Sequence, residues 1–315
     1  MRAVVTGGAG FIGSHLVDAL ITTGAEVLVI DDLSRGRRAN LSSGPARWAH
    51  LVQLDVRDGE GVHRAVRDFH PEVVFHLAAQ IDVRCSVAKP AYDAAINVLG
   101  SVNVLTAAQA AGVRRVVNTS TGGALYGPVG VIPTPESTPP NPISPYGLSK
   151  LTAERYARWF HHARGLDVVS LRYGNVYGPR QDPTADAGVV AIFCARVLDG
   201  HRPVIYGDGR QTRDFVFVAD VVAANLAVAS AATLAHTEYN IGTGTEISVL
   251  KLAQAVAEAA GTSAAMYEPE FAPARPGELI RSCLDVTRAR AELGLAPPTR
   301  LAEGLARTLE WLRCR

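Results

Sequence analysis

The feature that most restricts the fold of this chain is a regular alternation of short apolar runs with helix-like segments. The apolar runs are expected to be strands, and they lie at residues 2–6, 26–30, 51–55, 72–78, 114–120 and 167–173. Helical patterns lie between them, at residues 11–23, 59–69, 91–111 and 146–164. Because the strand runs are apolar at successive positions, helices should cover both faces of each strand. The pattern therefore predicts an α/β fold of the Rossmann type, with a doubly wound parallel sheet and right-handed crossovers.

The second half of the chain does not continue this regular alternation, because glycine and proline interrupt it frequently. Helices are expected there at residues 188–199, 219–230, 248–260 and 301–313. We expect residues 1–173 to form the domain that carries the sheet. Residues 174–315 should mainly form a smaller lobe over the carboxyl ends of the strands, where ligands bind in such folds, with some later segments returning to the first domain.

Composition and charge exclude several classes of function. The 315 residues carry a formal net charge of +1, which argues against a nucleic-acid-binding protein that works through a general basic field. The cysteines are scattered and form no Cys-x-x-Cys pair, so we expect reduced thiols and no metal site. The N-terminus lacks a signal-peptide pattern, and no run reaches the roughly 18 apolar residues of a membrane span. We therefore expect a soluble, cytoplasmic protein with no nucleic-acid or membrane partner.

The segment VVTGGAGFIGSHL joins the first strand to the first helix and carries Gly7, Gly10 and Gly13. Glycines at these places permit a tight turn and let a pyrophosphate approach the backbone N–H groups at the helix N-terminus. Asp31 ends the second strand, where it can accept hydrogen bonds from the 2′-hydroxyl of an adenosine ribose. The segment therefore predicts a dinucleotide site at the carboxyl ends of the first strands.

Two features bear on which dinucleotide binds. The Asp31 carboxylate would repel the 2′-phosphate of NADP, whereas Arg35, Arg37 and Arg38 follow closely and could hold that phosphate. Asp31 could alternatively cap a helix or a turn. Because an acid at the strand end disfavours the phosphate directly, NAD is the expected cofactor.

Tyr146 and Lys150 lie one helical turn apart in SPYGLSK, on the same face of a predicted helix. A free phenol has a pKa of about 10, and a neighbouring positive charge lowers it toward the range in which tyrosine acts as an acid or base. This spacing occurs on many helix surfaces, so its meaning depends on the rest of the chain.

The motifs that accompany this pair are, in chain order, the three glycines, Asp31, HLAAQ, Asn97, TSTGGALYG and Tyr146-x-x-x-Lys150. Together they resemble the extended short-chain dehydrogenase/reductase family, and within it the bacterial UDP-glucose 4-epimerases. The likeness runs from Met1 to the last helix. It implies a Rossmann fold, NAD as the cofactor, a UDP-sugar substrate and a homodimer that pairs two long helices. It also implies a 4-epimerase that converts UDP-glucose and UDP-galactose through a transient 4-keto sugar.

The resemblance implies three catalytic residues. Tyr146 would take the O4 proton of the sugar, and Thr121 would hold O4. Lys150 would bond the nicotinamide ribose, and its charge, with that of NAD⁺, would lower the Tyr146 pKa. The segment around Thr121 has one residue more than in many relatives, so Ser120 is the alternative hydroxyl.

The binding residues follow from the motifs and from the resemblance together. Expected cofactor-binding residues are Gly7, Gly10, Phe11, Ile12, Gly13, Asp31, Asp32, Ser34, Gly36, Asp55, Val56, Leu77, Ala78, Ala79, Gln80, Asn97, Thr119, Tyr146, Lys150 and Tyr173. Expected substrate-binding residues are Arg84, Ser86, Thr121, Tyr146, Asn175, Val189, Tyr206, Arg213, Arg275, Glu278 and Ser282. The two arginines Arg213 and Arg275 suit a nucleotide diphosphate, although either could instead form a surface salt bridge.

Three alternative functions remain at this point. Sugar-nucleotide 4,6-dehydratases follow the threonine with an Asp–Glu pair, whereas this chain has Gly122 and Gly123, which disfavours elimination of water. An arginine at Arg84 could pair with a C6 carboxylate, so a UDP-uronate 4-epimerase is the runner-up. A non-catalytic protein that binds NAD or a nucleotide sugar is the third, but it would not need the three catalytic residues.

The small residue Ser282 bears on the size of the sugar. In UDP-glucose 4-epimerases, a position in this segment limits the space beside the C2 substituent, and a large tyrosine there resembles glucose-restricted members. If the register slips by one, the residue is Cys283, which is also small. We therefore expect UDP-GlcNAc and UDP-GalNAc to be substrates as well.

Overall fold

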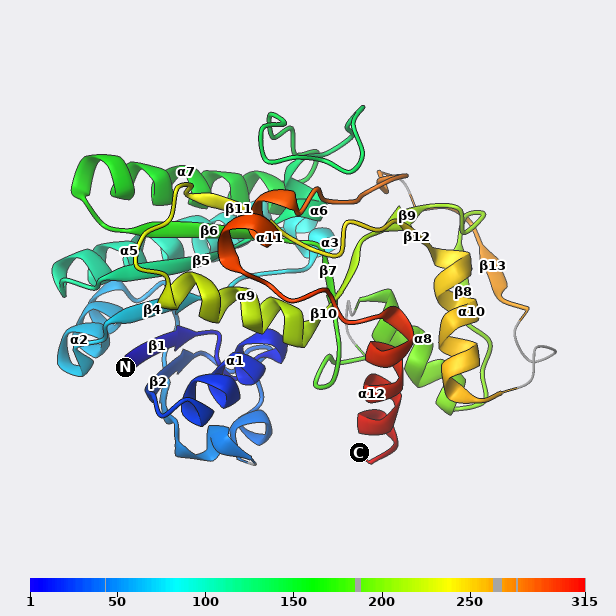
Figure 1. Cartoon of the computed structure of the whole chain (residues 1–315), viewed down its shortest axis with the longest axis horizontal. Helices are drawn as coiled ribbons and strands as arrows, with labels where there is room; N and C mark the ends of the chain where they lie inside the picture. Colours follow the sequence, from blue (N-terminus) through cyan, green and yellow to red (C-terminus); the bar gives the residue numbers. More distant parts are fainter. Residues whose placement is uncertain (43, 185–187, 263–267, 276, 315) are drawn as a thin grey trace.

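A computed structural model describes residues 1–42, 44–184, 188–262, 268–275 and 277–314. Its centre is a parallel sheet of seven strands in the order β11-β6-β5-β4-β1-β2-β3 (Figure 1). The strands are β1 (Arg2–Thr6), β2 (Glu26–Asp31), β3 (His50–Gln53), β4 (Val73–His76), β5 (Arg115–Thr121), β6 (Val168–Tyr173) and β11 (Glu238–Ile241). The neighbours of β1 are β2 and β4, so the strand order reverses there and a ligand crevice opens between β1 and β4.

The predicted α/β fold of the Rossmann type is confirmed, and all the predicted strands of the first half are present. The central strands β4 and β6 are buried at every position, as their continuous apolar runs require. The edge strand β3 is mostly exposed. The strand β11 was not expected, because EYNI is short and half polar; it becomes a strand by pairing with β6.

Helices cover both faces of the sheet (Figure 1). Two of them, α1 (Phe11–Thr22) and α9 (Val218–Ser230), bury apolar side chains against one face. The other face carries α2 (Gly59–Phe69), α5 (Ser101–Ala110) and α7 (Pro145–Arg164). The two faces thus form two separate apolar cores, with the sheet between them.

The helix expected at residues 91–111 is interrupted in the structure. It consists of α4 (Pro90–Ala94), the π-helical turn η3 (Ala95–Gly100) and then α5, and the short helix α3 (Val83–Ala88) precedes it. A π-turn inside an α-helix is rare and occurs frequently at functional sites. Asn97 lies in this turn and is almost fully buried, which directs its amide into the molecule.

A second lobe lies beside the sheet (Figure 1), and its buried side chains form an apolar core of their own. It contains α8 (Val189–Leu198), α10 (Val249–Ala260), α12 (Leu301–Arg313) and the parallel pair of β8 (Val204–Tyr206) with β13 (Glu270–Ala272). Two further short pairs are β7 (Asn175–Tyr177) with β10 (Phe215–Phe217), and β9 (Thr212–Arg213) with β12 (Ile247–Ser248). The remaining short elements are η1 (Arg38–Leu41), η2 (Pro45–Trp48), α6 (Gly122–Leu125) and α11 (Thr287–Leu293).

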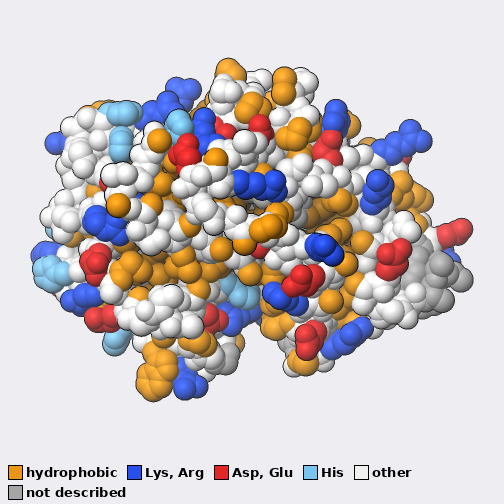
Figure 2. Space-filling view, in the orientation of Figure 1, with side chains coloured by type: hydrophobic (Ala, Val, Ile, Leu, Met, Phe, Trp, Pro, Cys, Tyr) orange, Lys and Arg blue, Asp and Glu red, His pale blue; other side chains and the backbone are white. Residues whose placement is uncertain are grey.

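The segments after residue 173 divide between the two parts of the molecule. While α8, α10 and α12 build the second lobe, β11 extends the main sheet and α9 covers it. Within the described ranges, no helix combines the length and apolar character that crossing a bilayer requires. Figure 2 shows acidic and basic side chains interspersed on the visible face, as expected for a net charge of +1.

Candidate active site

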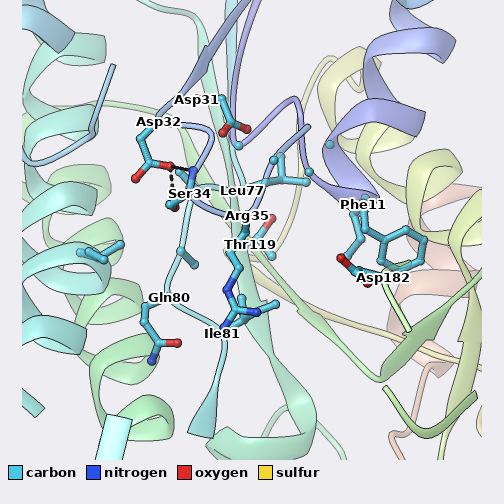
Figure 3. Close-up of a pocket in the computed structure, with 18 of the residues that line it drawn as sticks. Phe11, Asp31, Asp32, Ser34, Arg35, Leu77, Gln80, Ile81, Thr119 and Asp182 are labelled. Atoms are coloured by element: carbon cyan, nitrogen blue, oxygen red, sulfur yellow. Dashed lines mark hydrogen bonds between the residues drawn. The ribbon is translucent and has the colours of Figure 1, made fainter. Parts of the chain in front are cut away.

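A cavity of about 900 Å³ lies at the carboxyl ends of the strands, on both sides of the crevice between β1 and β4. Every cofactor residue expected from the sequence lines it except Asn97, which is buried behind the wall. Figure 3 shows Asp31, Asp32 and Ser34 at one end of this cavity and Gln80 with Ile81 at the other. The sequence did not single out several lining residues from the second half of the chain, namely Val176, Arg180, Gln181 and Trp311.

The glycine-rich turn packs closely on itself and on the chain after β4, at places where a side chain would not fit. Gly7 has a φ of +70°, and a Cβ on it would lie 2.7 Å from the Ala78 nitrogen. A Cβ on Gly13 would lie 2.2 Å from the Gly7 carbonyl oxygen, which excludes any other residue at that place without movement. The N-terminus of α1 has Gly10 at its cap position and no side-chain cap. The free N–H groups of its first turn therefore suit a pyrophosphate.

Asp31 is both a turn cap and a candidate ribose ligand. It is 6% exposed; its Oδ2 accepts from the Ala9 N–H at 2.9 Å and its Oδ1 from the Leu33 N–H at 2.8 Å. Burial raises the pKa of Asp31, and these two hydrogen bonds lower it. A carboxylate has about four acceptor sites, so the capping role leaves room for ribose hydroxyls.

The three arginines that follow β2 are engaged with the protein itself. Arg35 pairs with Asp82 at 3.8 Å, Arg37 with Asp182, and Arg38 donates to Gln53 Oε1 at 2.9 Å. In Figure 3, the Arg35 side chain extends through the cavity toward Ile81. The residues at this end therefore fit the adenosine of NAD: the acid is in place and the arginines have other partners.

Tyr146 and Lys150 lie in the first turns of α7, where the sequence favours a helix start. The Ser144 side chain caps the helix by accepting from the Gly147 N–H, and Pro145 occupies the first position. The side chain of Thr121, at the end of β5, is hydrogen-bonded to Tyr146. All three predicted catalytic residues line the same cavity.

The choice between Thr121 and Ser120 follows from the alternation of side chains along β5. Ser120 is 3% exposed, and its hydroxyl donates to Glu154 Oε2 at 2.9 Å. Successive residues of a strand point to opposite faces, so Thr121 faces Tyr146 instead. Thr121 also accepts from the Ala124 N–H at 3.3 Å, which fixes its orientation.

Burial dominates the titration of the pair in the protein itself. It raises the pKa of Tyr146 to about 12, although the Thr121 hydrogen bond lowers it, and the charge of Asp93 raises it further. Burial lowers the pKa of Lys150 to about 8, against the charges of Asp93 and Glu154. The low Tyr146 pKa expected beside bound NAD⁺ is thus absent from the protein alone.

Ser86, expected to contact the sugar, lies behind the site. Its side chain is fully buried; the hydroxyl donates to the Val83 carbonyl at 2.6 Å and accepts from the Tyr146 N–H at 3.1 Å. It therefore supports the first turn of α7. Arg84, two residues before Ser86, is exposed on α3.

Two of the expected substrate residues, Asn175 and Ser282, lie close together beside Gly123. A Cβ on Gly123 would lie 3.8 Å from Asn175 Oδ1 and 3.9 Å from Ser282 Oγ. Cys283 is 1% exposed and its thiol points toward Asp214 Oδ2 at 3.9 Å. Of the two register alternatives, Ser282 is the residue that faces Gly123.

The remaining expected substrate residues lie in the second lobe. Arg213 donates to Glu278 Oε1 at 3.0 Å, and the Arg275 guanidinium stacks 3.9 Å above the Tyr206 ring. Val189 begins α8 and is half-buried. Apart from Thr121 and Tyr146, none of the expected substrate residues is on the wall of the cavity described above. Over the described ranges, no group of His, Cys, Asp and Glu is placed to hold a metal ion.

Comparison with known proteins assigns the family. Residues 3–242 match the model of the NAD dependent epimerase/dehydratase family. The chain is 48% identical to a UDP-glucose 4-epimerase from Mycolicibacterium smegmatis over 99% of both chains.

Two solved structures are also similar. One is the UDP-glucose 4-epimerase of Thermotoga maritima with UDP-glucose, with a TM-score of 0.94 and 45% identity over 100% of this chain and 99% of that one. The other is the UDP-glucose 4-epimerase of Thermus thermophilus in complex with NAD, with a TM-score of 0.90 and 44% identity over 99% of both chains. The resemblance seen in the sequence and the expectation of NAD are thereby confirmed. This chain belongs to the NAD dependent epimerase/dehydratase family.

Proposed function

We propose that the protein is an NAD-dependent 4-epimerase that interconverts UDP-glucose and UDP-galactose. The observation that carries the proposal is the arrangement of Thr121, Tyr146 and Lys150 on one wall of a cavity whose other end fits adenosine and pyrophosphate. The relatives of similar length and high identity support the same activity.

Each residue of the triad has a distinct task. Bound NAD supplies the acceptor and donor of the hydride at C4. Tyr146 Oη accepts the proton of the sugar O4 as C4 becomes a carbonyl, and it returns that proton after the 4-keto sugar has presented its other face. Thr121 holds O4 beside the phenol, and Lys150 bonds the nicotinamide ribose while its charge favours the phenolate.

A 4,6-dehydratase is disfavoured because its acid and base have no counterpart after Thr121. Gly122 and Gly123 occupy those positions. A Cβ on Gly122 would lie 2.5 Å from Leu284 Cδ2, so an aspartate there would require the Leu284 side chain to move. Elimination of water across C5 and C6 would therefore lack its proton carriers.

We propose that the N-acetylated sugars UDP-GlcNAc and UDP-GalNAc are also substrates. The short Ser282 side chain beside Gly123 and Asn175 supports this, because a larger residue would occupy the space of the C2 substituent. A UDP-uronate substrate is the second candidate, since Arg84 is exposed on α3, next to the site.

A homodimer through α7 and the helical segment that runs from α4 through η3 to α5 is part of the same proposal. Apolar side chains of α7 are exposed, with Leu148 at 57%, Tyr156 at 42% and Trp159 at 48%. Exposed apolar side chains along one helix suit a protein interface. Analytical ultracentrifugation tests this: the wild type should sediment as a dimer and the Trp159→Glu variant as a monomer. A monomeric wild type would contradict the proposed dimer.

The test of the activity is a panel of nucleotide sugars assayed by NMR for epimer formation, with no cofactor added. UDP-galactose should yield UDP-glucose without consumption of a dinucleotide, because the hydride returns to the sugar. Conversion of UDP-glucuronate alone would favour the uronate candidate. Release of a 4-keto-6-deoxy sugar would instead identify a dehydratase.

A further inference from the structure

Asp93, on α4, is a buried carboxylate beside the catalytic pair that the proposed reaction does not use. It is 1% exposed, and its Oδ1 accepts from Gln80 Nε2 at 2.7 Å and from Asn97 Nδ2 at 3.1 Å. Its other oxygen, Oδ2, is buried and has no hydrogen-bond partner among the residues that the structure describes. Burying a carboxylate with an unpaired oxygen is costly unless a positive charge lies nearby. A cation close to Asp93 would offset this cost.

The cation is Lys150, on α7, the helix that packs against α4. Lys150 is 4% exposed. Asn97 connects the two helices, because its Nδ2 donates both to Asp93 Oδ1 and, at 3.1 Å, to the Ser149 hydroxyl next to Lys150. Burial lowers the pKa of Lys150, and the charges of Asp93 and Glu154 raise it. Of these two charges, Asp93 has the larger effect. Among the described residues no direct ion pair joins Asp93 and Lys150, so the carboxylate acts through space.

The other titratable groups near the pair are neutral or already paired. Glu154, on α7, forms a buried ion pair with Arg172 of β6. His76, on β4, is fully buried, and burial together with the charge of Lys150 lowers its pKa to about 3, so it is neutral. Asp93 is therefore the carboxylate near Lys150 whose charge is not offset by an arginine.

We propose that Asp93 is the counter-ion of Lys150, a positioning residue that keeps the lysine protonated in the apolar interior. A charged Lys150 can donate to the ribose hydroxyls and favour the phenolate of Tyr146. Asp93 acts through Lys150 and touches neither sugar nor cofactor. The proposal rests on the role of Lys150 in the proposed function, but its test requires no turnover.

The test uses the fact that the chain has only three lysines, Lys89, Lys150 and Lys251. Lysines labelled with ¹³C at Cε are titrated by NMR in the protein with its bound NAD, and Lys150 is assigned with Lys150→Arg. In Asp93→Asn, the amide oxygen can keep accepting from the groups that bond Oδ1, so only the charge is lost. The Lys150 midpoint should then fall by about one pH unit, as expected for an opposite charge at close range.

A matched control is Asp58→Asn, which removes the same charge at the N-cap of α2, away from the cavity, and keeps a capping side chain. It should leave the Lys150 midpoint unchanged. If Asp93→Asn does not fold, Asp93→Ser carries the same prediction. An unchanged Lys150 midpoint in the Asp93 variant, or an equal shift in the Asp58 variant, would overturn the proposal.

A second readout separates an electrostatic role from a structural one. A counter-ion predicts that the alkaline limb of the rate profile, where Lys150 loses its proton, moves to lower pH in Asp93→Asn. A structural residue would lower the rate by one factor at every pH. If the Lys150 midpoint shifts in Asp93→Asn but the wild-type protein has no epimerase activity, the proposed function is refuted and the counter-ion assignment remains.

Discussion

Replacing Tyr146 by Phe removes one oxygen atom from the candidate active site and tests the proposed chemistry most directly. The half-buried phenol lines the cavity and is hydrogen-bonded to Thr121, while the ring packs at the start of α7. Because the ring stays, the variant should lose one hydrogen bond, or about 1 kcal/mol of the free energy of unfolding. A general acid–base group contributes roughly 10²–10⁴-fold to the rate. At about 1.36 kcal/mol for each factor of ten, the barrier should rise by about 2.7–5.5 kcal/mol.

The assay follows the conversion of UDP-galactose to UDP-glucose by NMR, together with the melting temperature and the NAD content of each preparation. Tyr177→Phe is the control, because it deletes a buried tyrosine hydroxyl away from the cavity, 3.5 Å from the Leu301 carbonyl oxygen, in the core of the second lobe. We expect Tyr177→Phe to keep the wild-type rate and Tyr146→Phe to keep NAD but lose turnover. A Tyr146→Phe variant within a few-fold of the wild-type rate would refute the assignment of the proton carrier.

Four further predictions concern single substitutions. Gly13→Ala should abolish retention of NAD, since its Cβ would lie 2.2 Å from a carbonyl oxygen of the glycine-rich turn; nucleotide released on denaturation measures this. Asp31→Ala should relax the preference for NAD, so the same assay should recover NADP as well. If the wild type released mainly NADP, the argument that Asp31 excludes the 2′-phosphate would be wrong. Ser282→Tyr should lower kcat/KM for UDP-GlcNAc at least about fivefold more than for UDP-galactose, because overpacking costs about 1–3 kcal/mol. Glu154→Gln should lower the free energy of unfolding by about 3–5 kcal/mol in denaturant titration, because it leaves the buried Arg172 unpaired.

The sheet was predictable from the sequence because burial on both faces leaves a continuous apolar run. The strands β1 and β4 carry such runs and were found within two residues of their ends. The strand β11 carries Glu238 and Asn240, and its partners are far away in sequence, so no local pattern marks it. The π-turn at Asn97 was missed for a related reason: its hydrogen bonds to Gln80 and Ser149 come from other elements.

The site was predictable where a local motif carries the geometry. The glycine turn and the spacing of Tyr146 and Lys150 fix their own placement, since each lies within one turn or one helix. The orientation of Ser86 was not predictable, because its partner is the backbone of a helix 60 positions later. Asp93 likewise gave no signal, since its importance depends on an oxygen left unpaired after folding.

One face of α7 couples the chemistry to the fold. Tyr146, Lys150 and Glu154 follow one another at intervals of one helical turn; Lys150 and Glu154 are buried, and Tyr146 is half-buried on the wall of the cavity. Each meets a partner from a different element: the phenol bonds Thr121 of β5, the lysine lies in the field of Asp93 of α4, and the glutamate pairs with Arg172 of β6. Moving α7 by a single residue would turn these side chains away from all three partners at once, leaving polar groups buried and unpaired. The contacts that fix the position of this helix are therefore the same contacts that orient the proton carrier, so a substitution in any one of them should alter both turnover and stability.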